Sequence, residues 1–504
     1  MKPSPADTAI WWIRRDLRLA DNPALLAAAQ HGRLIPLYIH AEAADAAHDE
    51  AHAAPGAASR WWLHHGLKAL DVQLRALGSG LHVAQGKAEN VLGQYVREHG
   101  VNAVYWNRQY APAQIARDTR IKHDLRAQGA QVASFNASLL NEPWSISQGG
   151  KNDRGKSDAP ARPYKVFTPY WKACLKQGIE HTPLPAPERL PPVPINPLAG
   201  IELDSLQLLP RISWDRGLTT AWTPSEYSAW SRLRTFLEQA LSSYPEGRNL
   251  PAQAGCSRLS PHLAFGEISP RQIVHALRQF QATHPALDDE AVRVFLSELG
   301  WREFGYHLLY HFPHTLDTAL NPRWEVLQWP QPEPQLWLAW THGQTGIPLV
   351  DAGMRELWHT GWMHNRVRMN VASLLVKNML IPWQHGERWF ADTLVDFDLA
   401  SNAQGWQWTA GCGADAAPYF RIFNPVLQGE KFDPDGDYIR RWVPELAALP
   451  TRWIHRPWEA PAQVLQSAEV TLGMNYPRPV LDLAASRQRA LAFFAALKQA
   501  PTAV

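Results

Sequence analysis

The sequence predicts an α/β domain followed by a larger helical domain. Short apolar runs alternate with segments of helical periodicity as far as residue 135, and helical periodicity dominates from residue 222 onward. A proline-rich stretch separates the two regions. A chain of 504 residues is long enough for two or three domains with large buried cores.

The N-terminal region, residues 1–135, is predicted to contain a parallel sheet. Short apolar runs indicate buried strands at residues 9–13, 34–39, 81–84, 103–106 and 131–135. Apolar residues recur at helical spacing between them, at residues 22–30, 58–77 and 88–99. Strands that alternate with helices favour a Rossmann-like α/β domain.

Residues 136–221 are predicted to link the two domains. A polar, basic stretch at 145–162 is typical of a loop, and residues 181–198 contain seven prolines. So many prolines exclude a helix interior or a central strand. The all-α domain is then expected over residues 222–485, with a C-terminal helix and tail over 486–504.

Composition narrows the class of protein. The formal net charge is +2, from 49 Lys and Arg against 47 Asp and Glu, which neither requires nor excludes nucleic acid. The three cysteines, at 174, 256 and 412, are too few for a disulfide scaffold or a cysteine-based metal site. We therefore expect a cytoplasmic protein without a metal. No apolar run approaches the roughly eighteen residues of a membrane span.

Several long motifs occur together in the second half of the chain. Residues 346–383, 394–408 and 417–433 read GIPLVDAGMRELWHTGWMHNRVRMNVASLLVKNMLIPW, LVDFDLASNAQGWQW and APYFRIFNPVLQGEKFD. Upstream lie SRLSPHLAFGEISPRQ at 257–272, SELGWREFGYHLLYHFP at 297–313 and the opening IWWIRRDLRLADNPAL at 10–25. In this order the motifs resemble the photolyase/cryptochrome family of flavin-dependent, light-driven proteins. The resemblance covers nearly the whole chain and implies an antenna-chromophore domain before an all-α FAD-binding domain.

The resemblance also implies a set of FAD-binding residues. They are Tyr244, Ser257, Arg258, Leu259, Ser260, Arg302, Arg368, Asp396, Asp398 and Asn402. Hydroxyls and backbone N–H groups at a helix start suit a pyrophosphate. Taken alone, Ser257 or Ser260 is equally well an ordinary N-cap. Arg368 and Asp396 could likewise be a purely structural salt bridge.

The substrate pocket is expected on the helix predicted within residues 297–313. Glu298, Trp301 and Arg302 fall at i, i+3 and i+4, on one helical face. The resemblance implies that Glu298 hydrogen-bonds a flipped-out cyclobutane pyrimidine dimer, stabilising its radical anion, and that Trp301 stacks on the dimer. For an isolated helix, a surface glutamate beside a core tryptophan is the simpler explanation.

Further residues discriminate among members of the family. Photolyases that act on the (6–4) photoproduct carry two adjacent histidines, whereas Asn365 follows His364 here, as in the cyclobutane-dimer enzymes. By resemblance, Met369 packs against the dimer and Trp408 forms a second aromatic wall. Asn402 stands where plant cryptochromes generally carry an Asp beside flavin N5, and a neutral amide favours the anionic, reduced flavin. The tail at 451–480 looks like that of plant cryptochromes, which suggests the bacterial class III subgroup.

Electron transfer and DNA binding are implied in the same way. Trp406, Trp383 and Trp329 match the family's chain of three tryptophans from flavin to surface, although a chain with 24 Trp has many core aromatics. The DNA-binding positions are Arg248, Arg366 and Arg421, together with Trp301 and Trp408. The arginines would bind phosphates and give affinity rather than sequence reading. Each arginine alone is equally well an ordinary surface or ion-pairing residue.

The second chromophore is left open. Residues 105–110 resemble the family, but Ala113 and Gln114 stand where folate-binding enzymes carry Asn-Glu. A methenyltetrahydrofolate, a deazaflavin or no antenna all remain compatible with the sequence.

The expected activity is light-driven repair of pyrimidine dimers in DNA, by a monomer with no obligate protein partner. The alternatives are a cryptochrome photoreceptor, a (6–4) photolyase and a dark flavin oxidoreductase. Asn402 and Glu298 argue against the first, and Asn365 argues against the second. The third would need a nicotinamide-type glycine fingerprint, which the sequence lacks.

Overall fold

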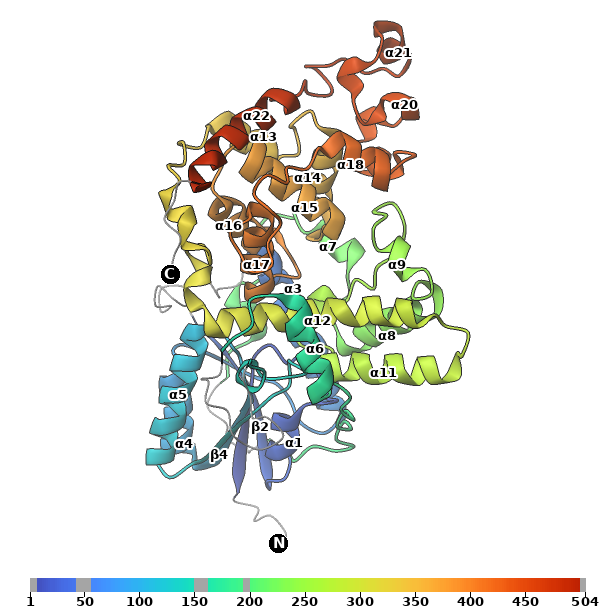
Figure 1. The fold of residues 1–504 in the computed structure, drawn as a ribbon. Helices are drawn as coiled ribbons and strands as arrows, with labels where there is room; N and C mark the ends of the chain where they lie inside the picture. Colours follow the sequence, from blue (N-terminus) through green and yellow to red (C-terminus); the bar gives the residue numbers. More distant parts are fainter. Residues whose placement is uncertain (1–6, 42–55, 149–161, 194–199, 499–504) are drawn as a thin grey trace.

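The computed structural model describes residues 7–41, 56–148, 162–193 and 200–498. Figure 1 shows the sheet and its helices at one end of the molecule and the remaining helices stacked beyond them. Helix α12 (Asp289–His311) crosses the middle, between the sheet and the helices nearest the C-terminus. The predicted division into an α/β region and a helical region is confirmed.

The N-terminal sheet has five parallel strands in the order β3-β2-β1-β4-β5. Every residue of the central strand β1 is buried, because helices cover both faces of a parallel sheet. In register, Ile10 of β1 pairs with Ile35 and Val104. All five predicted strands are present, at β1 (Thr8–Ile13), β2 (Arg33–His40), β3 (His82–Gln85), β4 (Val101–Asn107) and β5 (Gln131–Phe135).

Three helices of this domain lie in the segments predicted from periodicity, and a fourth, α5 (Pro112–Ala127), was not predicted. Asn22 caps the first of them by accepting a hydrogen bond from the Leu25 amide at 3.1 Å. The strand order reverses between β1 and β4, which leaves a crevice at the carboxyl ends of these two strands. The helices are α1 (Pro23–Ala28), α3 (Ala57–Ala76), α4 (Ala88–His99) and α5 (Pro112–Ala127).

Residues 136–221 contain helices as well as irregular chain. The elements are η2 (Pro143–Ser145), α6 (Phe167–Gln177), η3 (Leu203–Leu206) and α7 (Arg216–Ala221). Tyr170, Trp171 and Cys174 of α6 are buried in the same apolar cluster as residues of α12, so α6 belongs to the helical packing. The proline-rich stretch is irregular over residues 181–193. Its remainder, and most of the predicted basic loop, lie outside the described residues.

The helical region is built on two apolar clusters, the one shared by α6 and α12 and a larger one. Its α-helices beside α12 are α8 (Glu226–Gln239), α9 (Tyr244–Gly247), α10 (Ser260–Ala264), α11 (Pro270–Thr283), α13 (Pro334–Thr341), α14 (Pro348–Thr360), α15 (Asn365–Ser373), α16 (Trp383–Thr393), α17 (Leu399–Ala410), α18 (Pro425–Phe432), α19 (Asp437–Trp442), α20 (Thr451–Ile454), α21 (Ala462–Ser467) and α22 (Leu483–Phe494). A π-helical turn, η6 (Leu374–Asn378), extends α15. Phe494 at the end of α22 is buried in the larger apolar cluster, so the predicted C-terminal helix packs into the helical domain.

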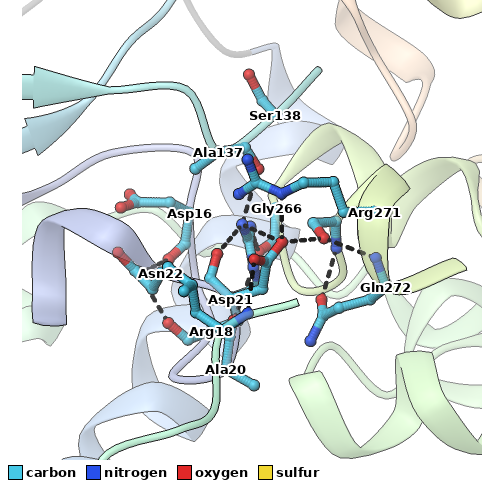
Figure 2. Close-up of polar contacts among 12 residues, drawn as sticks. Asp16, Arg18, Ala20, Asp21, Asn22, Ala137, Ser138, Gly266, Arg271 and Gln272 are labelled. Carbon is cyan, nitrogen blue, oxygen red and sulfur yellow. Dashed lines mark hydrogen bonds and ion pairs between the residues drawn. The ribbon is translucent and has the colours of Figure 1, made fainter. Parts of the chain in front are cut away.

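A buried polar cluster joins the two regions. Arg18, which follows β1, donates to the Gly266 carbonyl at 2.9 Å, and Asp21 accepts from the Ser269 hydroxyl at 2.5 Å and from Arg271 Nε at 2.9 Å (Figure 2). These bonds fix the chain after β1 against the segment between α10 and α11.

Candidate functional site

An ion pair lies where the substrate pocket is predicted, a place that we call the pocket mouth. Arg248, which follows α9, places Nη2 at 2.7 Å from Oε1 of Glu298 on α12. Burial raises the pKa of Glu298, and the positive charges of Arg248 and Arg366 oppose that rise. Arg366 of α15 hydrogen-bonds Asn249 and lies 4.5 Å over the ring of Phe432. The structure therefore brings together three of the predicted residues.

The exposed ring of Trp301 forms one wall beside this mouth. Its side chain is 38% exposed, and one face stacks on Phe167 of α6, with ring centroids 3.8 Å apart and planes 8° from parallel. The Phe167 amide donates to Asp415 at 3.2 Å, which holds this supporting ring in place. Phe167 was not predicted as a site residue. The arrangement gives Trp301 a rigid backing and suits stacking of a planar group on its other face.

The other predicted pocket residues are less enclosed. Asn365 and Arg421 are exposed, while Met369 and Trp408 are half-buried. Met369 lies next to the mouth, with Sδ 3.9 Å from Arg366 Nη1.

The residues predicted for the phosphate cradle include 257–260, which lead into α10, and Gly255 lies just before them. Arg258 has a left-handed backbone (φ 52°), and its guanidinium lies 4.3 Å over the ring of Trp362. A Cβ at Gly255 would lie 2.3 Å from the Gly247 carbonyl oxygen, so only glycine allows this close approach. Leu259 is the N-cap of α10, and no side chain caps the helix. Capping therefore does not account for Ser257 and Ser260.

Two predicted site residues, Asp396 and Trp406, each keep a buried polar atom without a hydrogen-bond partner among the described residues. Arg368 Nη2 bonds Oδ2 of Asp396 at 2.7 Å. The two open atoms are Oδ1 of Asp396 and Nε1 of Trp406. The Asp396 oxygen can accept a further hydrogen bond, and the Trp406 nitrogen can donate one.

Asn402 is held by a residue that sequence reasoning missed. Its Nδ2 donates to the backbone oxygen and to Oε1 of Glu387 on α16, each at 3.0 Å. Because the amide nitrogen is used in this way, the amide oxygen is free to accept. Burial raises the pKa of Glu387 to about 7. No pattern around Glu387 marks it in the sequence, because its partner lies on a different helix.

Comparison with known proteins identifies the fold family. Residues 9–188 match the family described as DNA photolyase, and residues 295–496 match the FAD binding domain of DNA photolyase. A deoxyribodipyrimidine photo-lyase of Agrobacterium fabrum is 47% identical, over 97% of this chain and 98% of the relative. The chain belongs to the photolyase/cryptochrome family. FAD is the cofactor of its helical domain.

Two further similarities place the chain within the family. A structure described as a bacterial class III photolyase from Agrobacterium tumefaciens has a TM-score of 0.90 at 45% identity and covers 98% of both chains. Cryptochrome-1 of Arabidopsis thaliana is 39% identical over 95% of this chain and 69% of the relative. The predicted likeness to both bacterial class III photolyases and plant cryptochromes is confirmed.

The predicted ligands of the photolyase flavin divide into two groups. Asp396 carries one of the open atoms described above, and Arg368 bonds its other carboxylate oxygen. Asp398 accepts from the Tyr306 hydroxyl at 2.5 Å. Burial disfavours the Asp398 carboxylate, but Arg302 and Tyr306 outweigh burial and lower its pKa. Arg302, Tyr306 and Leu399 line a cleft between the domains.

That cleft measures about 550 Å³, including space open to solvent. Arg15, Arg108 and Tyr110 line its other side, at the carboxyl ends of β1 and β4 where the strand order reverses. Gln114 of α5, one of the two residues that depart from the folate-binding pattern, also lines it. This position is where open α/β sheets generally bind ligands.

His364 is a neutral helix cap. Its Nδ1 accepts from the Arg366 amide at 3.2 Å at the start of α15, and burial together with nearby arginines lowers its pKa to about 3. Cys256 Sγ lies 3.5 Å from its Nε2. A histidine in this setting is a poor proton donor.

The three predicted tryptophans of the electron path share one core without direct ring contact among the described ring pairs. Trp406 packs against Phe390 and Trp340, with centroids 5.0 and 6.3 Å away, whereas Trp329 stacks on Trp324 at 6.4 Å. Trp383 is buried at the start of α16, and Gly386 of the same helix lies against the Trp406 ring.

A continuous series of ring contacts runs in another direction from Trp406. It passes through Trp340, Trp337 and Trp389 to Trp358, with centroids 5.5 to 6.3 Å apart at each step. Trp358 is 59% exposed.

Within the described residues, no group of three or more His, Cys, Asp or Glu side chains could hold a metal ion. No helix in this part of the chain is long and apolar enough to cross a membrane.

Proposed function

We propose that the protein is a light-driven DNA photolyase that splits cyclobutane pyrimidine dimers. The observation that carries this proposal is the pocket mouth, where Glu298 and Trp301 lie on one face of α12 beside Arg248 and Arg366. A carboxyl group, an exposed aromatic face and two cations suit a flipped-out dimer of adjacent pyrimidines flanked by phosphates. The neutral His364 and the following Asn365 favour the cyclobutane dimer over the (6–4) photoproduct.

FAD would be held by three parts of the helical domain. The cradle at 257–260 suits its pyrophosphate, Asp396 and Arg368 suit the polar edge of its ring, and the Asn402 oxygen suits a ring N–H. When bound and reduced, FAD supplies the electron that light sends to the dimer and that returns after the ring opens. Glu387 keeps the Asn402 amide in one orientation.

The protein residues bind and orient the dimer. Trp301, backed by Phe167, would stack on it, and Met369 and Trp408 would complete the apolar surroundings. Glu298, when protonated, would donate a hydrogen bond to a base carbonyl and stabilise negative charge there. Arg248, Arg366 and Arg421 would bind the phosphates on either side. We infer that the protein acts as a monomer in the cytoplasm, without an obligate protein partner.

The first experiment is repair of a duplex that carries one defined thymine dimer. Chemically reduced protein is incubated with this duplex under blue light and in the dark. Restoration of both thymines only in the light is the expected result. The plant cryptochromes among the relatives make blue-light signalling the second candidate function. Light-driven flavin reduction with an intact dimer would reject repair and favour that candidate.

The cleft between the domains is the proposed place of an antenna chromophore. Fluorescence of the material released by denaturation distinguishes a folate from a deazaflavin. Gln114→Ala, in the cleft lining, should lower the chromophore content without changing the FAD content. Unchanged occupancy would remove the cleft from this role.

Trp406 is the proposed first donor for light-driven reduction of oxidised flavin. Trp406→Phe should abolish this reduction and leave repair by chemically reduced protein intact. Comparison of Trp383→Phe with Trp340→Phe then tells which direction the electron takes from Trp406. A Trp406→Phe variant that is still reduced by light would reject this assignment.

A further inference from the structure

The Arg248–Glu298 ion pair brings together a residue proposed to bind a DNA phosphate and a residue proposed to hydrogen-bond the damaged base. Arg248 is assigned to a phosphate and Glu298 to the base, yet in the protein alone they bind each other at 2.7 Å. Their side chains are 24% and 31% exposed, so incoming DNA can reach both. The guanidinium also lies 5.5 Å over the Tyr244 ring, which orients it across the mouth of the pocket.

The charge around Glu298 is set mainly by two arginines. Arg248 faces it from the segment after α9, and Arg366 faces it from α15. Tyr244 and Cys256 also face it, but burial raises the pKa of both groups, that of Cys256 to about 11, so both stay neutral at pH 7. Burial raises the pKa of Glu298, and the two arginines limit that rise because they favour the carboxylate.

A DNA phosphate would compete with the Glu298 carboxylate for the guanidinium of Arg248. Guanidinium groups bind phosphate and carboxylate with the same paired hydrogen bonds, and a phosphate brings a permanent negative charge. Arg366 is already engaged with Asn249 and Phe432. Arg248, whose described ion pair is with Glu298, is therefore the group that a phosphate would draw away.

We propose that Arg248 acts as a switch residue, exchanging Glu298 for a DNA phosphate when the lesion enters, and that Glu298 then takes up one proton from solvent. This inference rests on the proposed repair function and adds its regulation by substrate. An ionised carboxylate only accepts hydrogen bonds, whereas the protonated carboxyl can donate one to a base carbonyl. The carboxyl thus becomes a donor only when damaged DNA is present, and the proton comes from the buffer without any redox change.

Proton uptake on binding is the direct measurement. Calorimetric titration of the FAD-loaded protein with dimer-containing duplex, in the dark and in two buffers of different ionisation enthalpy, gives the number of protons taken up. We expect close to one proton per complex at a pH between the pKa values of free and bound Glu298. Because binding raises that pKa, affinity should fall by up to tenfold per pH unit as pH rises through this interval. Glu298→Gln should show neither uptake nor the pH slope.

Two arginine variants separate the switch from general phosphate binding. Arg248→Gln leaves Glu298 without its closest cation, so the carboxyl is already largely protonated in the free protein and uptake should fall. Arg421→Gln removes an exposed arginine of the same footprint. It should weaken binding and flatten the salt dependence, while uptake stays as in the unmodified protein. FAD content and thermal unfolding show whether each variant is folded.

Equal uptake in the unmodified protein and Glu298→Gln would overturn the switch, as would undiminished uptake in Arg248→Gln. Repair under blue light, measured on the same preparations, keeps the two proposals apart. Light-dependent repair without linked protons rejects the switch alone. Absence of repair rejects the proposed function whatever the protons do.

Discussion

Two polar clusters of this protein contain the same kinds of residue and differ in how deeply they are buried. In the interdomain cluster, Arg18 is 1% exposed and donates to four backbone carbonyl oxygens, and both oxygens of Asp21 accept hydrogen bonds (Figure 2). At the pocket mouth, Arg248 and Glu298 bond each other while remaining partly exposed. Deeper in the site, Asp396 and Trp406 each keep an unpaired polar atom.

The difference shows which cluster serves the fold and which awaits a ligand. A buried charge whose hydrogen bonds are all made inside the protein contributes rigidity and has no capacity for a substrate. A half-exposed pair, which solvent and a substrate can both reach, has that capacity. Substitutions in the first cluster should therefore affect stability, and substitutions in the second should affect binding and chemistry.

The largest effect is expected from Asp21→Ala in the interdomain cluster. The change removes the acceptor of Ser269 and Arg271 and leaves buried Arg18 without its neighbouring carboxylate, which costs about 3–5 kcal/mol of unfolding free energy. Denaturant unfolding measures it. Glu290→Ala, which breaks an exposed pair with Arg293, is the matched control and should leave stability unchanged. Equal losses in the two variants would contradict the distinction.

A smaller effect, on selectivity and not on stability, is expected from Glu298→Ala. Loss of the hydrogen bond to the dimer should lower the preference for damaged over undamaged duplex by about tenfold, or ~1.4 kcal/mol, with fewer repairs per absorbed photon. Glu298→Gln keeps a donor and should retain most of the preference. Binding titrations and repair yields on both duplexes check this. Full repair in Glu298→Ala would remove Glu298 from its assigned role.

The pH dependence of the flavin should reveal Glu387. Its pKa is raised to about 7, so the carboxyl is protonated below pH 7 and negatively charged above it. A negative charge behind Asn402 disfavours an anionic reduced flavin, so the midpoint potential should decrease additionally as pH rises through about 7. Glu387→Gln should abolish this extra step and raise the potential at pH 8. A step of the same size in the variant would exclude Glu387 as its source.

The smallest effect is expected from Tyr306→Phe, which removes the hydroxyl donor to Asp398. One such bond contributes about 1 kcal/mol. Arg302 and Tyr306 lower the pKa of Asp398, so the stability it contributes is present at neutral pH and lost as pH falls through the folded-state value. The variant should lose that stability at a slightly higher pH in acid unfolding. An unchanged acid transition would show that Arg302 and Ser401 set this pKa without Tyr306.

The sequence by itself determined the order of the architecture and the chemical identity of the site. Apolar runs located all five strands because a parallel sheet buried on both faces needs continuous apolar residues. Local motifs likewise predicted roles for Glu298, Asn365 and Asn402, since the type of side chain at a motif position is a property of the sequence alone.

Only the tertiary structure decided which side chains meet. Arg248 with Glu298, Glu387 with Asn402 and Phe167 with Trp301 each join different elements of the chain. Burial and the neighbouring charge then set whether each carboxyl is ionised. Such contacts depend on how helices pack against each other, and that packing cannot be predicted from the spacing of residues along one helix.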